Sequence, residues 1–128
     1  MKNYIFVSIV LLLISGCSQS TSKESKRFMG IIGDVTVSKI EVIDGRTGQR
    51  HSITKTEKIE QFYQLLNERE YKEMKNHEDL KGYIYCAVLY SGKKDFNITF
   101  LGDEIDINGT YYALNNPILE EDIFKVLE

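Results

Sequence analysis

The sequence predicts a two-layer α+β fold, in which two helices cover one face of a mostly antiparallel sheet. Several short stretches alternate apolar and polar residues, and turn residues such as Asn108-Gly109 separate them closely enough for hairpins. Two further stretches repeat apolar residues at helical spacing. Hairpins make neighbouring strands antiparallel, and amphipathic helices bury their apolar sides on a sheet. The expected order is β-β-α-β-β-β-β-α.

The first half of the pattern predicts a hairpin and a helix. Residues 35–44 alternate in polarity with a one-residue slip at Ser38-Lys39, which indicates a bulge, and residues 50–54 return as a second strand. Thr54 and Glu57 match a capping box ahead of a helix over residues 56–67. That helix has a continuous apolar face, made of Ile59, Phe62, Tyr63 and Leu66. The highly charged residues 68–81 fit either a helical extension or an exposed loop.

The second half predicts four more strands and a closing helix. The strands are residues 83–90, 95–101, 104–107 and 110–114. Asn108-Gly109 predicts a type I′ turn, because both of its central positions need positive φ. Asn116-Pro117 is expected to begin the last helix, since proline is tolerated at a first helical position. Its apolar face would be Leu119, Ile123, Val126 and Leu127.

The first seventeen residues have the pattern of an export signal. Lys2 supplies a positive charge, residues 4–14 form an almost wholly apolar run, and the small residues Ser15 and Gly16 precede Cys17. A membrane-spanning helix needs about 20 apolar residues, so this run is too short to remain as one. It is expected to be removed.

The four residues Ile14-Ser15-Gly16-Cys17 also resemble the lipobox of bacterial lipoproteins. This resemblance implies cleavage before Cys17, diacylglycerol on the Cys17 thiol, and a cell-membrane location on the outer face. It leaves open whether the new amino terminus is acylated as well. The alternative is an ordinary secretory signal with a coincidental cysteine, which the bulky Ile14 at the −3 position disfavours.

The expected organisation has three parts. Residues 1–16 would be the removed signal, and residues 17–30 would be the lipidated Cys17 with a polar, Ser-rich tether. Residues 31–128 would form a single α+β domain, which is a usual domain length.

Composition and motifs limit the function classes. The net charge is −3 at pH 7 and no basic cluster occurs, which argues against a nucleic-acid partner. Metal-ligand pairs and phosphate-binding loops are also missing, so we predict no cofactor, no metal and no catalytic residue. Residues 104–109 resemble the opening of a calcium loop, but Ile105 and Ile107 fit a strand better.

These observations predict a membrane-anchored, non-catalytic module that binds a protein, peptide or envelope component. Tyr83 and Tyr85 alternate on one face of a strand and are expected to anchor a binding surface on the helix-free side of the sheet. Alternatively, the tyrosines simply fill the sheet. Two other classes stay open: an envelope hydrolase or transferase using Asp103, Glu104 and Asp106, and an immunity or accessory lipoprotein.

Overall fold

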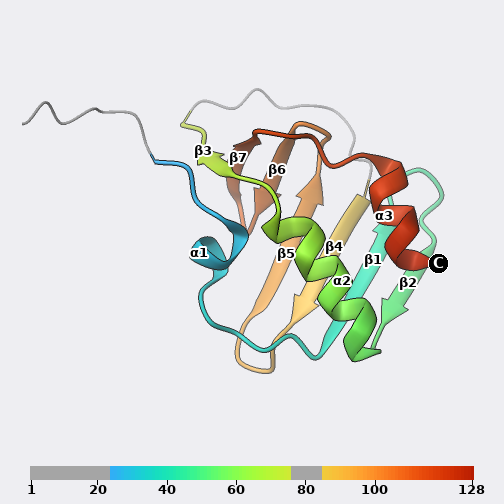
Figure 1. The fold of residues 1–128 in the computed structure, drawn as a ribbon. Coiled ribbons are helices and arrows are strands. Elements are labelled where there is room, and N and C mark those ends of the chain that lie inside the picture. Colours follow the sequence, from blue (N-terminus) through green and yellow to red (C-terminus); the bar gives the residue numbers. More distant parts are fainter. Residues whose placement is uncertain (1–23, 76–84) are drawn as a thin grey trace, which may run out of the picture.

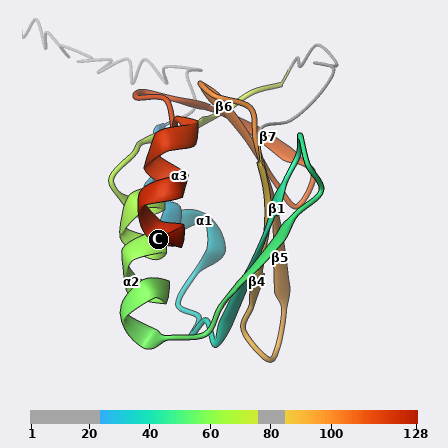
Figure 2. The same cartoon turned by 90° about the vertical axis from the view of Figure 1, so that its right-hand side faces the viewer.

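The computed structural model describes residues 24–75 and 85–128. Within these residues, seven strands form one antiparallel sheet in the order β2-β1-β4-β5-β6-β7-β3. Three helices all lie against the same face of this sheet (Figures 1 and 2). The predicted α+β class is therefore confirmed, with one additional strand and one additional short helix.

The strands and helices have the following bounds. The strands are β1 Lys39–Asp44, β2 Arg50–Ile53, β3 Tyr71–Glu73, β4 Tyr85–Tyr90, β5 Asp95–Phe100, β6 Glu104–Ile107 and β7 Thr110–Leu114. The helices are α1 Phe28–Ile32, α2 Thr56–Asn67 and α3 Glu120–Leu127. None of these described helices is long and apolar enough to cross a bilayer.

The hydrophobic core lies between the sheet and the helices. Strand side chains that point inward alternate with partly exposed ones, as on β4, where Tyr85, Ala87 and Leu89 are buried. From the opposite layer, α2 and α3 contribute an apolar stripe each, made of Ile59, Phe62 and Leu66 on α2 and Ile123 and Val126 on α3. Burial of these two stripes against the strands holds the layers together.

Two sequence signals are confirmed closely. Helix α2 has the predicted bounds, because its apolar residues recur at helical spacing over three turns. The turn between β6 and β7 has positive φ at Asn108 (51°) and Gly109 (90°), as a type I′ turn requires. The predicted capping box of α2 is absent: its N-cap residue is Lys55, and no side chain caps the helix there.

The folded part of the chain begins earlier than predicted. The main chain of Lys26 exchanges two hydrogen bonds with that of Tyr71, at 2.8 and 2.7 Å. Phe28 is fully buried and its ring contacts those of Tyr63 and Tyr71. The expected tether over residues 17–30 is therefore too long, because its last residues contribute an aromatic side chain to the core.

Three other element boundaries also differ from prediction. The slip at Ser38-Lys39 marks the start of β1 and not a bulge, so residues 34–38 precede the strand. Over its described residues, the charged stretch 68–81 is not a helical extension: Tyr71–Glu73 form the edge strand β3 and the residues on either side of it are irregular. Residues 76–81 lie outside the described residues. Helix α3 begins at Glu120, where the Asp122 carboxylate accepts the Leu119 amide at 2.9 Å.

Candidate functional site: a groove beside helix α2

The structure places one predicted anchor, Tyr85, in the core. Its side chain is fully buried on the helix-covered face, and its ring packs edge-on against that of Phe124 at 5.9 Å. The prediction that Tyr85 forms part of an exposed platform is wrong, because its side of β4 is the side that the helices cover. Tyr83 and Cys17 lie outside the described residues.

Charged groups lie near the buried Tyr85 hydroxyl. Among the described residues, no hydrogen bond to the Tyr85 Oη atom is formed. Burial, together with the nearby charges of Asp44 and Glu120, raises the pKa of Tyr85, and the nearby Arg46 guanidinium opposes this rise. The Asp44 carboxylate accepts the Arg46 amide at 2.8 Å, and the Arg46 guanidinium also pairs with Glu120. Asp44, Arg46 and Glu120 therefore connect the β1–β2 turn to α3, and we assign them a structural role.

The helix-free face has a charged network at one end. The Arg50 guanidinium lies 2.7 Å from a Glu41 carboxylate oxygen, and the Tyr90 hydroxyl donates to the other oxygen at 3.4 Å. The hydrogen bond from Arg50 is the largest influence lowering the pKa of Glu41. Lys39 lies over the Tyr90 ring at 5.5 Å. These four side chains satisfy one another across neighbouring strands.

The acidic residues of the hydrolase hypothesis lie around two turns. Glu104 and Asp106 alternate with the buried Ile105 and Ile107, so they point to the helix-free side. The Asp106 carboxylate accepts the Gly109 amide at 2.7 Å and so stabilises the β6–β7 turn. Asp103 is exposed in the preceding turn. Over residues 24–75 and 85–128, His, Cys, Asp and Glu side chains do not gather in a group of three that could hold a metal ion.

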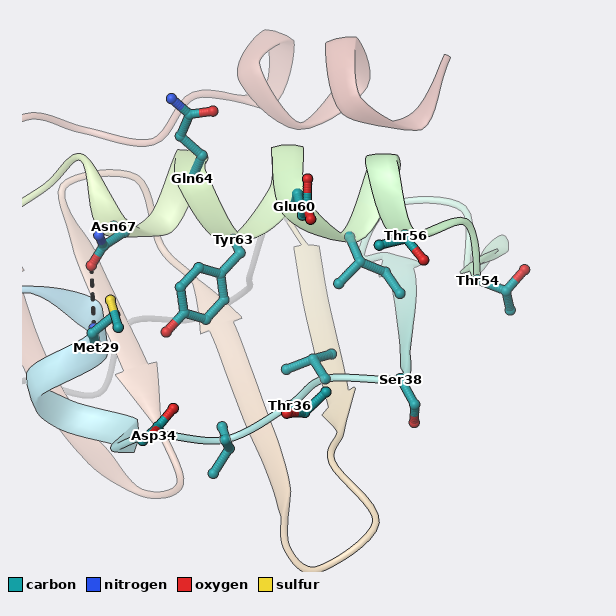
Figure 3. Close-up of a pocket in the computed structure, with 13 residues that line it drawn as sticks. Met29, Asp34, Thr36, Ser38, Thr54, Thr56, Glu60, Tyr63, Gln64 and Asn67 are labelled. Atoms are coloured by element: carbon teal, nitrogen blue, oxygen red, sulfur yellow. Dashed lines mark hydrogen bonds between the residues drawn. The ribbon is translucent and has the colours of Figure 1, made fainter.

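A groove of about 760 Å³, here called the α2 groove, lies beside helix α2 (Figure 3). One wall is the extended segment 34–38, and the other is a face of α2. The lining side chains are Asp34, Val35, Thr36, Val37 and Ser38 from the segment, Thr54 and Thr56, Ile59, Glu60, Tyr63, Gln64 and Asn67 from α2 and the turn before it, and Met29 from α1.

Local sequence explains both walls. Gly33 has a φ of 80°, which ends α1 and sends the chain into the extended segment. Val35 and Val37 then alternate inward onto the core, while Thr36 is exposed. On α2, the lining residues recur every three or four positions, so they share one face of the helix.

The main chain of the 34–38 wall is largely free. In the described parts of the chain, the N–H and C=O groups of residues 34–37 form no backbone hydrogen bond. Pairing with the sheet starts at Ser38, whose amide donates to the Tyr90 carbonyl at 2.8 Å. The main-chain donors and acceptors of residues 34–37 are therefore left to bind water or a ligand.

One end of the groove is closed and its charge is negative. The Asn67 side-chain oxygen accepts the Met29 amide at 3.3 Å, which joins α2 to α1 at that end (Figure 3). Two carboxylates, Asp34 and Glu60, line the groove, and its lining contains no lysine or arginine. The Tyr63 ring points into the gap, and burial together with the Asp34 charge raises the pKa of Tyr63.

The groove cannot be predicted from the alternation of residues 35–38. This alternation predicts a strand, but it is the same in a strand and in an isolated extended segment. The slip at Ser38-Lys39 was the available signal, since it marks the point where the chain joins the sheet.

Comparisons with protein-family models, curated proteins and solved structures found no match to this chain.

Proposed function

We propose that this protein is a membrane-anchored lipoprotein whose folded domain is a non-catalytic binding module on the outer face of the cell membrane. The lipobox-like residues 14–17 support the anchor. The α2 groove supports the binding role, and its partner would be a protein, a peptide or an envelope component.

The observation that carries the binding role is the combination of size and lining in the α2 groove. Its volume of about 760 Å³ falls within the range of about 300–1,000 Å³ typical of ligand sites. Val35, Val37 and Tyr63 are only partly buried, so apolar surface stays accessible between the two walls. Hydroxyl, amide and carboxylate groups surround this apolar strip and could fix the orientation of a ligand.

The anchor can be tested by metabolic labelling with radioactive palmitate. The intact chain should incorporate label, and Cys17→Ala should abolish incorporation because the acceptor thiol is lost. Cys86→Ala is the matched control and should label normally, since Cys86 lies half-buried on β4. Equal labelling of the intact chain and the Cys17→Ala variant would contradict the anchor.

The binding role can be tested by photocrosslinking in intact cells. A photoreactive amino acid is placed at Thr36 or Thr56, which are exposed on the two walls of the groove, and at Asn97, which is exposed on β5. We expect discrete crosslinked species from the groove positions and none from Asn97. Mass spectrometry of those species would identify the partner and show whether it is a membrane protein that an accessory or immunity lipoprotein would guard. Absence of adducts at both groove positions would contradict the binding role.

A further inference from the structure

We propose that the α2 groove binds an extended peptide segment with alternating apolar side chains and at least one lysine or arginine, which adds as a strand alongside residues 34–37. This inference rests on the proposed function, because it names the class of ligand for the same site.

The free main chain of residues 34–37 favours an added strand. Strand addition joins an extended peptide to exposed N–H and C=O groups, and these hydrogen bonds supply affinity that does not depend on the peptide sequence. Residues 34–37 are extended and form no backbone hydrogen bond among the described residues. Val35 and Val37 pack against the core but are only partly buried, so a ligand would meet the main chain of this wall together with the accessible parts of these two side chains.

The dimensions fit a short strand. The wall over residues 34–38 is about 13 Å long at about 3.3 Å per residue in an extended chain. The opposite wall, α2 from Thr56 to Asn67, is about 16 Å long at about 1.5 Å per residue. A groove of this length accommodates about four or five residues of an extended peptide.

The charge of the lining selects a basic ligand. Asp34 and Glu60 are the charged side chains of the lining, one on each wall. A lysine or arginine of the ligand would offset them, whereas an acidic peptide would be repelled. Apolar ligand side chains would cover Val37, Ile59 and the Tyr63 ring.

The same lining disfavours an acyl chain as the ligand. A hydrocarbon tail would cover the carboxylates and the free main-chain groups of residues 34–37 without offering a hydrogen bond. Covering a polar group without replacing its hydrogen bonds to water is unfavourable. A peptide supplies both the apolar contacts and the missing bonds.

The test is a selection from a displayed library of random heptapeptides against the full chain held in phospholipid nanodiscs. We expect enriched peptides that alternate apolar residues and contain lysine or arginine. Glu60→Gln and Asp34→Asn should each weaken binding of an enriched peptide by about two- to fivefold, as expected for partly exposed charge pairs. Glu57→Gln is the matched control, because Glu57 is an exposed carboxylate on the same helix outside the groove, and it should leave affinity unchanged.

A chemical variant of the peptide tests strand addition. Methylation of two alternate amide nitrogens removes two donors and should weaken binding by about tenfold or more if those donors pair with residues 34–37. Equal affinity of the methylated and unmethylated peptides would overturn the strand geometry. Methylation of the other alternate set, whose donors would point away, serves as the control.

Several outcomes would overturn the ligand class. These are a lack of enrichment, enrichment of acidic peptides, indifference of binding to both groove carboxylates, and occupancy of the groove by oleate in place of peptides. If one of these outcomes is found while Thr36 still crosslinks to a partner in cells, the protein is a binding module but its ligand is not this class of peptide. If one of these outcomes is found and the groove positions also give no crosslinks in cells, the binding role is contradicted as well.

Discussion

At the scale of single residues, Arg69 is one of two charged residues that are buried in the described part of the chain. It is 6% exposed and its guanidinium donates to the carbonyls of Leu65 and Pro117, at 2.8 and 3.2 Å. It also lies 3.4 Å from an Asp122 carboxylate oxygen. One side chain thus ties the end of α2 to the segment before α3 and to the first turn of α3.

Arg69→Ala should lower the free energy of unfolding by about 1–3 kcal/mol, because partly buried acceptors lose a charged donor and the packing of the Arg69 stem is lost. Urea unfolding followed by circular dichroism would measure this change. Arg50→Ala is the matched control: the Arg50 side chain is 68% exposed and pairs with Glu41 at the surface, so its loss should cost less than about 1 kcal/mol. Equal effects of the two substitutions would show that Arg69 does not join the helices.

Two buried tyrosines should respond differently to loss of the hydroxyl. Tyr71 Oη donates to the Leu66 carbonyl at 2.5 Å, so Tyr71→Phe should lower stability by about 1–2 kcal/mol. Tyr85 Oη is buried and accepts or donates no hydrogen bond within the described part of the chain, so Tyr85→Phe should leave stability unchanged or raise it by up to about 1 kcal/mol. Thermal unfolding of both variants would show the contrast, and a loss at Tyr85 equal to that at Tyr71 would contradict it.

The Asp44 carboxylate should make the fold sensitive to acid. The hydrogen bond from the Arg46 amide is the largest influence that lowers the pKa of Asp44 in the folded state. Because the pKa of Asp44 is lower in the folded than in the unfolded state, the ionised carboxylate stabilises the fold at pH values above the ordinary carboxyl pKa of about 3.9. This stabilisation is lost as the pH falls through the pKa of the folded state. Unfolding measured from pH 6 down to pH 2 should therefore show a smaller loss for Asp44→Asn than for the intact chain. An unchanged slope would contradict this role.

At the scale of elements, the β6–β7 turn depends on backbone conformations that favour glycine. Gly109 has a φ of 90°, where a Cβ atom is strained even though space around it is open. Gly109→Ala should cost about 1 kcal/mol or more. Gly30→Ala in α1 is the control, since its Cβ would meet only Lys26 Cβ at an ordinary 3.7 Å, and it should be neutral or stabilising. Chemical denaturation of both variants separates these expectations.

Elements were predictable from sequence where a local pattern was strong and long enough. The twelve residues of α2 cover three helical turns with one apolar face, and Asn108-Gly109 has a single favoured geometry. Helix α1 has five residues and β3 has three, too few for either period to show. Their stability comes from tertiary contacts such as the burial of Phe28, which no local pattern reports.

At the scale of the whole molecule, the sequence could not tell which face of the sheet the helices cover. On β4, Tyr85, Ala87 and Leu89 alternate with Cys86, Val88 and Tyr90, and both sets are largely apolar. Alternation therefore separated the two faces correctly but gave no reason to choose between them. The α2 groove escaped prediction for a related reason, because it is formed by segments far apart in the sequence.

Residues 24–30 should contribute to the stability of the whole domain. A chain that begins at residue 31 lacks Phe28 and the Lys26–Tyr71 hydrogen bonds, so it should be less stable than one that begins at residue 24 by at least about 3 kcal/mol. Urea unfolding of the two chains would measure the difference. Equal midpoints would show that the first described residues only rest on the surface.

The pairing of Lys26 with Tyr71 also bears on how the domain would respond to mechanical tension. If Cys17 is fixed to a bilayer, a pull on the domain reaches the sheet first at these two hydrogen bonds, at the outer edge beside β3. They are isolated from the longer ladders, so only the neighbouring contacts of Arg27 and Phe28 would share such a force with them. The first step of extension would then be the peeling of this edge, with the central strands still intact.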